Sequence, residues 1–546
     1  MNASSFIVIT LLATSGLSSL EAEDTHLLSV RIVDEDGNIT PARAWVDADK
    51  KRLFHPSSPK TATPYERDRS FSCEGKFTMN VPIGKVVIHV EKGKEFFPVD
   101  QAVTIGEERL VETTITMKRW IDMPTRGWYS GDLHVHLGHD DPGILRQLSL
   151  ADDVHLVPAF TYWLRGRGEK WNDDWPDKSY TTSIRIDDRH LITRNNIEIE
   201  RINKASIPGG FLGATFLYNL NSPVSVKQHG EHFPIDATLC RIARRGSPNA
   251  VFDCDKPSWA GTAISAALGT LDTVQVCHNH YHRAATISGG WGMIGPLTPG
   301  ESNAADDDSL FHRTNALYYR LLNCGFRLGV SGGSAIGVMP VATGQHRVYA
   351  MIEEPFTADK FWKATKAGQS FATSGPMIEL TVNGKGIGST LSRESKSSTP
   401  IVCEARVHSI DPLESLQIIY NGRVATTLDL VGKRKGNEVI REHLRCELMP
   451  KRSGWVAARA YFRAPDGRLR QGHTSPVYLA VDEKPAAFSV DANYMLRWVA
   501  VLEIIAKSNP ERFPSPSIQA DVLSVYEEAR TKYQEVLSAS QQFWGD

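Results

Sequence analysis

Two histidines separated by a single residue are the first feature of this chain that could do chemistry. They close the run Tyr129-Ser130-Gly131-Asp132-Leu133-His134-Val135-His136. Because side chains alternate along a strand, a strand here would place His134 and His136 on one face with Asp132 beside them. Imidazole is a common ligand of divalent transition metals, and two rings on one rigid strand lose little freedom on binding. The pair predicts a metal site, with two solvated histidines at a strand end as the alternative.

Two further clusters could supply ligands from other strands. Glu198 lies in the strand-like run Asn196-Ile197-Glu198-Ile199-Glu200, whose two carboxylates would face the same way and could bind an ion or pair with neighbouring arginines. A second buried run, Leu271 to Val276, leads into His278, His280 and His282. We expect these histidines to alternate on one face at the carboxyl end of their strand, where α/β barrels build active sites.

Length, composition and charge bound the class of protein. With 546 residues, 41% hydrophobic and 23% charged, the chain is long enough for about three or four domains. With a formal net charge of -2, the chain lacks the excess of positive charge that is typical of proteins that bind nucleic acid or an anionic membrane surface. No stretch reaches about 18 uninterrupted apolar residues, so we expect no integral membrane segment. The expected partner is a small molecule, and the oligomeric state stays open.

The pattern of apolar residues divides the chain into regions that must position these ligands. Short alternating strands between turn residues predict a β-sandwich over 24–119 and a second over 378–482. Residues 120–377 mix strand-like and helical runs and carry nearly all candidate ligands. In residues 483–546, apolar positions at helical spacing are divided by prolines, which predicts two helices. We therefore expect the chemistry of the protein to lie in residues 120–377.

The amino terminus and the cysteines bear on localisation. Residues 6–12 are almost wholly apolar, and Ala22 follows as a small residue at a plausible cleavage point. We predict an export signal over 1–22 and a secreted or periplasmic protein, with an irregular cytoplasmic amino terminus as the alternative. Seven scattered cysteines do not form a disulfide scaffold, although Cys403 and Cys446 fall in one predicted β domain and could pair after export.

Four motifs follow one another through the middle of the chain. They are GWYSGDLHVH at 127–136, NCGFRL at 323–328, RVY at 347–349 and AGQSFATSGP at 367–376. In this order, over about residues 120 to 385, the chain resembles the CehA/McbA-type branch of the PHP (polymerase and histidinol phosphatase) metallohydrolases. The resemblance implies a multidomain α/β plus all-β protein. A central distorted PHP-type βα barrel would be flanked by the two β-sandwiches and followed by the helical segment.

The resemblance also implies a divalent metal centre that hydrolyses phosphoesters, carbamates or related esters. It assigns metal ligands to His134, His136 and Glu198. We complete the set with His278 or His280 and with Asp255, enough for one or two zinc, manganese or iron ions. Three family positions differ, with Phe211, Lys256 and Ser334 near the places where a histidine, a second histidine and an aspartate are expected. A catalytically degenerate PHP-like protein acting as a cell-surface binding or structural module is therefore the alternative.

The remaining candidate residues would assist a metal-bound water. A divalent ion lowers the pKa of its bound water from about 15.7 toward 7 and polarises the attacked oxygen. His280 or His282 could protonate the leaving group, and Asp132 would orient a ligating imidazole. Ser334, in a glycine-rich loop, and Arg347 could bind an anionic part of the substrate, with a plain turn and a surface salt bridge as alternatives. The sequence thus predicts an exported, metal-dependent hydrolase acting on ester bonds.

Overall fold

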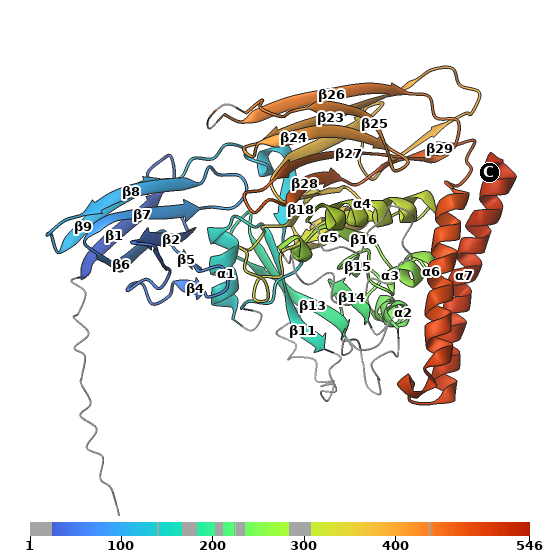
Figure 1. Cartoon of the computed structure of the whole chain (residues 1–546), viewed down its shortest axis with the longest axis horizontal. Coiled ribbons are helices and arrows are strands. Elements are labelled where there is room, and N and C mark those ends of the chain that lie inside the picture. Colours follow the sequence, from blue (N-terminus) through green and yellow to red (C-terminus); the bar gives the residue numbers. More distant parts are fainter. Residues whose placement is uncertain are drawn as a thin grey trace, which may run out of the picture.

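The computed structural model describes residues 25–138, 141–165, 183–202, 211–222, 224, 235–282, 307–434, 436 and 438–545. Within these residues the protein is mixed α/β, with most of its strands gathered in several sheets and with seven α-helices. Figure 1 shows a strand-rich N-terminal part beside a central part of strands and helices. More sheets lie above the centre, and a helical pair runs along its far side. The predicted export signal over 1–22 lies outside the described residues.

The N-terminal part consists of two small sheets that share one core. Its strands are β1 (Thr25–Val33), β2 (Ala42–Ala48), β3 (Lys51–Leu53), β4 (Thr63–Tyr65), β5 (Ser70–Cys73), β6 (Lys76–Pro82), β7 (Gly84–Glu91), β8 (Val99–Ile105) and β9 (Leu110–Thr116). One sheet has the order β6-β1-β9 and the other β4-β5-β2-β7-β8, with β3 on β2. Apolar side chains of both sheets meet in one buried cluster. The strands predicted at 28–33 and 86–90 are confirmed.

A single long sheet forms the centre of the molecule. Its strands are β10 (Trp128–Gly131), β11 (Leu156–Arg165), β12 (Ile184–Arg185), β13 (Leu191–Ile202), β14 (Phe211–Tyr218), β15 (Val251–Cys254), β16 (Thr273–His278), β17 (Gly329–Gly333), β18 (Arg347–Met351) and β19 (Ser370–Thr373). The order runs β17-β16-β15-β14-β13-β11-β10-β18-β19, with β12 on β13. Strands β10, β11 and β13 are parallel, as are β15, β16 and β17. Both parallel sets therefore direct their carboxyl ends to one edge each, where ligands can gather.

Helices connect and cover these strands. They are α1 (Pro142–Ala151), α2 (Asp236–Gly246), α3 (Thr262–Ala267), α4 (Asp307–Asn323) and α5 (Ala358–Lys366), with 3₁₀ turns η1 (Pro124–Arg126) and η3 (Asn279–His282). Helix α4 ends where the sequence predicted, because Gly325 adopts a left-handed φ of 85° and donates its N–H to the Leu322 carbonyl at 2.9 Å. The Asp141 carboxylate caps α1 by accepting the N–H groups of Gly143 and Ile144.

The C-terminal sheets are joined to the centre by hydrogen bonds. Their strands are β20 (Met377–Val382), β21 (Lys385–Gly386), β22 (Thr390–Arg393), β23 (Ile401–Ser409), β24 (Leu413–Tyr420), β25 (Arg423–Asp429), β26 (Ile440–Leu448), β27 (Gly454–Arg463), β28 (Leu469–Thr474) and β29 (Val477–Val481). One sheet has the order β21-β20-β23-β26, while β28-β27-β24-β25 continues the central sheet through β19. The strands predicted at 378–382, 416–420 and 455–461 are confirmed. The predicted regions 120–377 and 378–482 thus share one continuous sheet.

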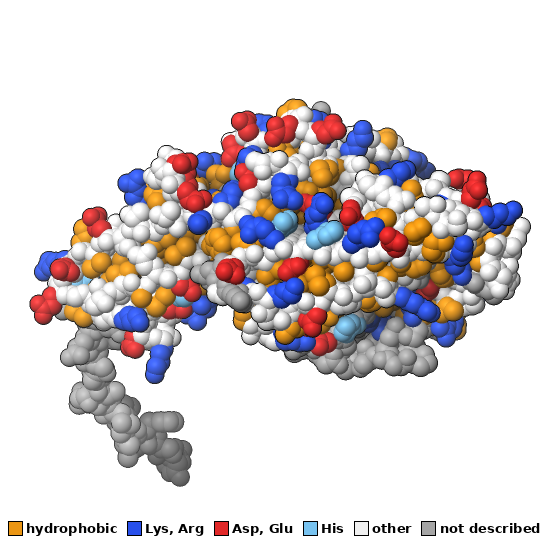
Figure 2. Space-filling model, turned by 90° about the horizontal axis from the view of Figure 1, so that it is seen from above, with side chains coloured by type: hydrophobic (Ala, Val, Ile, Leu, Met, Phe, Trp, Pro, Cys, Tyr) orange, Lys and Arg blue, Asp and Glu red, His pale blue; other side chains and the backbone are white. Residues whose placement is uncertain are grey.

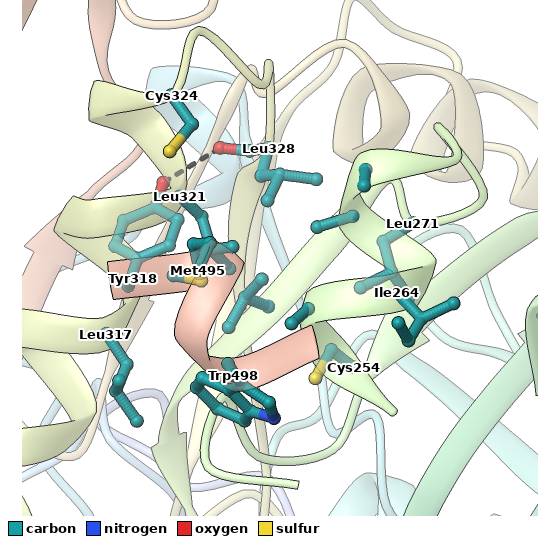
Figure 3. Close-up of a cluster of buried hydrophobic side chains, with 14 of the residues drawn as sticks. Cys254, Ile264, Leu271, Leu317, Tyr318, Leu321, Cys324, Leu328, Met495 and Trp498 are labelled. Carbon is teal, nitrogen blue, oxygen red and sulfur yellow. Dashed lines mark hydrogen bonds between the residues drawn. The ribbon is translucent and has the colours of Figure 1, made fainter. Parts of the chain in front are cut away.

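The chain ends in two helices, as the proline-divided pattern predicted. These are α6 (Ser489–Ser508) and α7 (Pro516–Trp544), separated by η4 (Pro510–Arg512). Figure 3 shows Met495 and Trp498 of α6 among apolar side chains of α3 and α4, so the helix pair is part of the central core. The Trp498 indole also donates to the Ala260 carbonyl at 3.2 Å. Among the described helices, none has both the length and the apolar composition needed to cross a membrane.

The surface agrees with the small net charge of -2. Figure 2 shows basic and acidic side chains interspersed over the face seen from above, and no broad field of one sign covers it. An interspersed surface of this kind gives little long-range steering of polyanions. On this face, binding of a ligand would therefore depend on local groups of side chains.

Candidate metal centre

The two predicted ligand histidines lie just beyond the end of β10. The predicted strand through His136 is wrong, since β10 ends at Gly131 and the following segment is irregular apart from bridges made by Val135 to Ala159 and Ile336. The side chains nevertheless come together, with 3.0 Å between the Nε2 atoms of His134 and His136. Both rings are largely buried. Two imidazole nitrogens therefore face the same point.

Asp132 has a structural role that differs from the predicted one. Its Oδ1 accepts the N–H groups of His134 at 3.1 Å and Ser334 at 2.9 Å, and its Oδ2 accepts the N–H of Gly344 at 2.6 Å. Burial raises the pKa of Asp132 to about 6, although these N–H donors act in the opposite direction. The carboxylate joins three backbone segments and does not orient an imidazole ring.

Glu198 completes a compact group of ligand atoms. It lies on β13, and its Oε2 is 3.1 Å from His136 Nε2 and 3.9 Å from His134 Nε2. One ligand atom from each residue lies within 4.8 Å of the others. The rings of Phe160 and Phe216 pack on His134 with centroid separations of 5.9 and 4.6 Å. The structure therefore brings together three of the predicted ligands, His134, His136 and Glu198, in a group that could hold a metal ion, with aromatic rings beside it.

Asp255 lies on the opposite side of the His134 ring. Its Oδ1 is 3.5 Å from His134 Nδ1, whereas its Oδ2 accepts hydrogen bonds from Lys256 and from the Trp259 indole. Burial alone would raise the pKa of Asp255, but the Lys256 ammonium and His134 hold it well below its usual range. Asp255, predicted as a metal ligand, is not part of the group formed by His134, His136 and Glu198, and its carboxylate lies beside Nδ1 of His134. Asp255 takes the orienting role predicted for Asp132.

The charge state of His134 suits metal binding. Burial lowers its pKa, while Asp255 and Glu198 raise it, and the balance leaves the pKa below the ordinary value. A neutral ring that directs Nδ1–H toward Asp255 has its Nε2 lone pair facing Glu198 and His136. Partnership of a carboxylate with the distal N–H is the usual way in which proteins fix a ligating histidine.

The histidine cluster after β16 is arranged differently from the prediction. β16 ends at His278 and the chain enters η3, so the expected alternation on a strand face is wrong. His278 contacts Thr314 Oγ1 through Nε2 at 3.0 Å, and burial, reinforced by Lys256, lowers the pKa of His278 to about 3. The His280 ring meets the His278 ring edge-on at 5.9 Å. The His282 side chain lies outside the described residues, and the three-atom ligand group does not include His278.

Ser334 and Arg347 are buried and engaged in backbone contacts. The Ser334 hydroxyl donates to the His346 carbonyl at 3.2 Å and accepts the N–H of His346 at 3.0 Å. The Arg347 guanidinium donates to the carbonyls of Gly344, Asp153 and Asp152 at 2.7, 3.1 and 3.0 Å. Arg347 has 0% of its surface exposed. Both substrate-binding predictions are therefore corrected to structural roles.

A second group of histidines and a carboxylate lies at the amino ends of β11 and β13. Its members are Asp153, His155 and His190. His155 Nδ1 accepts the Ser130 N–H at 2.8 Å, so the ring proton of neutral His155 is on Nε2, the nitrogen a metal would need. His190 lies between Asp153 at 3.3 Å and Asp187 at 2.8 Å, and these carboxylates raise the pKa of His190 above its ordinary value against the effect of burial. In this group His190 therefore pairs with two carboxylates beside a neutral His155.

Lys256 is the residue of the centre that sequence reasoning missed. In the sequence it is one residue of a turn that lacks an expected histidine, whereas in the structure its side chain is 3% exposed and its ammonium contacts Asp255. The Trp259 ring lies beneath it, 5.3 Å from Nζ to the ring centroid. The available signal was an adjacent acid and base directly after the apolar strand β15, since buried lysine is rare without a partner.

The three ligand atoms lie close enough together to surround one cation. Two atoms bound at about 2.0–2.1 Å to one tetrahedral ion lie roughly 3.3–3.4 Å apart, and the observed separations are 3.0, 3.1 and 3.9 Å. Two nitrogens and one carboxylate oxygen are donors that zinc, manganese and iron accept. The buried groups could therefore hold a metal ion, and the donor set leaves its identity open. Comparison with protein-family models, with curated proteins and with solved structures finds no match to the chain.

Proposed function

We propose that this protein is a hydrolase that uses one divalent metal ion, held by His134, His136 and Glu198. The observation that carries the proposal is the convergence of these three side chains from two separate segments in a buried position. A divalent ion bound there would supply a hydroxide at neutral pH and polarise the bond under attack. The bond class is a phosphoester, a carbamate or a related ester, as the motif resemblance implies.

The neighbouring residues support a single ion. Glu198 contributes the one negative charge of the ligand group, and the lowered pKa of His134 keeps that ligand neutral. The Asp255 oxygen that faces away from His134 is already bonded to the Lys256 ammonium. Lys256 therefore occupies the place beside Asp255 where a second cation would otherwise balance the carboxylate. Its ammonium is also a fixed positive charge that can stabilise an anionic oxygen nearby.

The arrangement of the strands supports the PHP-type barrel as part of this proposal. Val135, between the two ligand histidines, bridges in parallel to Ala159 of β11 and to Ile336 just after β17. Strand β17 is at one end of the sheet order and β11 lies in its interior, five positions away, so these bridges connect two distant parts of the sheet beside the metal centre. A closed parallel-rich sheet with ligands at the carboxyl ends of its strands is the arrangement in which βα barrels hold active sites.

Metal analysis combined with hydrolysis assays tests the function. The full chain should retain about one equivalent of a transition metal after purification, since buried histidine and carboxylate ligands bind such ions tightly. The double variant His134→Ala/His136→Ala should lose both the metal and the hydrolysis of p-nitrophenyl phosphate, p-nitrophenyl acetate or an aryl carbamate. His443→Ala removes a surface histidine of β26 whose side chain is 45% exposed, and serves as the matched control. A folded chain that binds no added metal would instead favour the degenerate binding module.

A further inference from the structure

A second hollow lies well away from the metal centre. It has a volume of about 1200 Å³ and lies open to solvent between α4, the β24–β25 hairpin and the beginning of α6. None of the described metal-centre residues lines it. Four arginines line it, namely Arg320, Arg423, Arg452 and Arg459. A single carboxylate, Asp491, is present in the lining, so the hollow is strongly basic although the protein as a whole is not. We call it the arginine cleft.

Asp491 neutralises only one of these arginines. Its Oδ1 accepts from the Arg320 guanidinium at 2.8 Å, and its Oδ2 accepts from the Asn323 amide at 2.9 Å. Both carboxylate oxygens are thus engaged on one side of the cleft. Arg423 and Arg459, two of the other lining arginines, form no ion pair with a carboxylate of the described residues.

Arg459 is the most informative residue of the cleft. It is 9% exposed, and its Nε and one terminal nitrogen donate to the Gln417 side-chain oxygen at 3.2 and 2.6 Å. No carboxylate among the described residues lies within ion-pairing distance of it. Aromatic rings hold the group, with Phe311 at 5.5 Å and Tyr461 at 5.7 Å. Buried cations in proteins are normally paired with an anion. The Arg459 guanidinium is therefore a group to which an anionic ligand could bind.

Two further arginines approach from other segments. Arg423 is exposed at the start of β25, directly after the Asn421-Gly422 turn, and forms no ion pair with any residue in the described part of the chain. The Arg452 guanidinium stacks on Phe488 at 4.0 Å and donates to the Ala487 carbonyl. Arginines from β25, from β27 and from the segment before β27 therefore line one space. Planar guanidinium groups match carboxylate, sulfate and phosphate oxygens in a bidentate manner.

We propose that the arginine cleft binds an organic anion that carries two or more sulfate, carboxylate or phosphate groups. Separated guanidinium groups favour a ligand with separated charges over a single small ion. The cleft volume of about 1200 Å³ is above the range of about 300–1,000 Å³ that is typical of sites for small molecules. A ligand of the size of an acidic sugar of a few units would fit this volume. The proposal stands independently of the hydrolase function.

Isothermal titration calorimetry of the full chain tests the proposal. The probes are sucrose octasulfate and trigalacturonate, with sucrose as the uncharged match. We expect saturable 1:1 binding of at least one charged probe, no binding of sucrose, and weaker binding as salt is raised, because charge pairing is screened. A preference between the two charged probes identifies which oxyanion the cleft accepts.

Matched charge reversals locate the binding. Arg423→Glu should weaken binding by about tenfold or more, as expected for loss of a charge-assisted hydrogen bond and its replacement by repulsion. Arg109→Glu makes the same charge change at an exposed site in the N-terminal sheets and should leave affinity unchanged. Arg459→Lys keeps the buried charge but loses the planar fork, and should weaken binding several-fold in a chain with unchanged unfolding temperature. Absence of saturable binding, or equal weakening by Arg109→Glu and Arg423→Glu, would overturn the proposal.

Discussion

Asp255 offers a sharp test of the metal centre, because a neighbouring carboxylate on the same strand end provides its control. Its Oδ1 lies 3.5 Å from His134 Nδ1, on the side of the ring away from the ligand nitrogen. The change Asp255→Asn keeps the shape of the side chain but removes the charge that holds the Nδ1–H of His134. We expect the variant to bind metal more weakly while retaining all three ligand residues.

The magnitude follows from the type of contact. Two full charges 3.5 Å apart would interact by about 5 kcal/mol at an effective dielectric constant of 20. A neutral imidazole N–H facing a carboxylate supplies a smaller part of this, about 1.5–3 kcal/mol for a hydrogen bond to a charged group. That energy corresponds to a loss of roughly 10–100-fold in metal affinity, the range found when such orienting partners are removed.

Asp253→Asn is the matched control. Asp253 lies two residues earlier, is equally buried, and accepts from Thr273, Gln275 and Ser331 at 2.6, 2.9 and 2.5 Å. Burial raises the pKa of Asp253 to about 7, so an amide changes its charge less than at position 255. Since Asp253 does not contact His134 in the described structure, the control should leave metal affinity within about threefold.

The assay is competition for zinc or cobalt with a chromophoric chelator at neutral pH. Asp255→Asn leaves the buried Lys256 ammonium without its partner, so the double variant Asp255→Asn/Lys256→Met should recover thermal stability but not metal affinity. Unchanged affinity in a folded Asp255→Asn chain, or equal loss in Asp253→Asn, would refute the assignment of Asp255 as the orienting residue.

Three further predictions address the rest of the fold. Cys403 and Cys446 are directly opposite each other on antiparallel β23 and β26. We therefore expect a glutathione redox buffer to lower the number of free thiols from seven to five, as counted with a thiol reagent. Seven thiols after oxidation would contradict a disulfide between them. Burial lowers the pKa of His473 to about 3, so the unfolded chain binds more protons below about pH 6.5 and stability should fall from there toward pH 3. His473→Gln should flatten this acid dependence of the unfolding temperature, and an unchanged slope would exclude His473 as a source. Arg347→Met removes the donor of hydrogen bonds to three buried carbonyls and should lower the free energy of unfolding in urea by about 3–5 kcal/mol. The metal content per folded chain should stay unchanged. Loss of metal from a chain of full stability would instead indicate that Arg347 acts at the metal centre.

Local patterns in the sequence were sufficient for much of the secondary structure. Alternation predicted β1, β7, β20, β24 and β27, and helical spacing broken by prolines predicted α6 and α7. Gly325 marked the end of α4, because a left-handed residue ends a helix through its own backbone geometry. These features depend on residues close together in the chain, so a single sequence carries them.

The candidate site divides in the same way. His134 and His136 are separated by a single residue, so the chain keeps them close, and the structure places their Nε2 atoms 3.0 Å apart even though no regular strand holds them. Glu198 was identified as a candidate from its strand position and is confirmed in the group. These three residue types made metal binding one of the chemistries open to the site, and the structure brings them into a group that could hold an ion.

The roles of the charged residues around that group were decided by tertiary structure alone. Asp132 and Asp255 are both acids at the ends of buried strands, yet one accepts backbone N–H groups and the other faces an imidazole. Arg347 and Arg459 are both buried, yet one is used by backbone carbonyls and the other lines an open cleft. The sequence by itself determined which segments are strands, which are helices and which side chains can ligate a metal. Which partner each buried charge meets depends on segments up to hundreds of residues away, because the free energy of a buried charge is set by the atoms that replace its water.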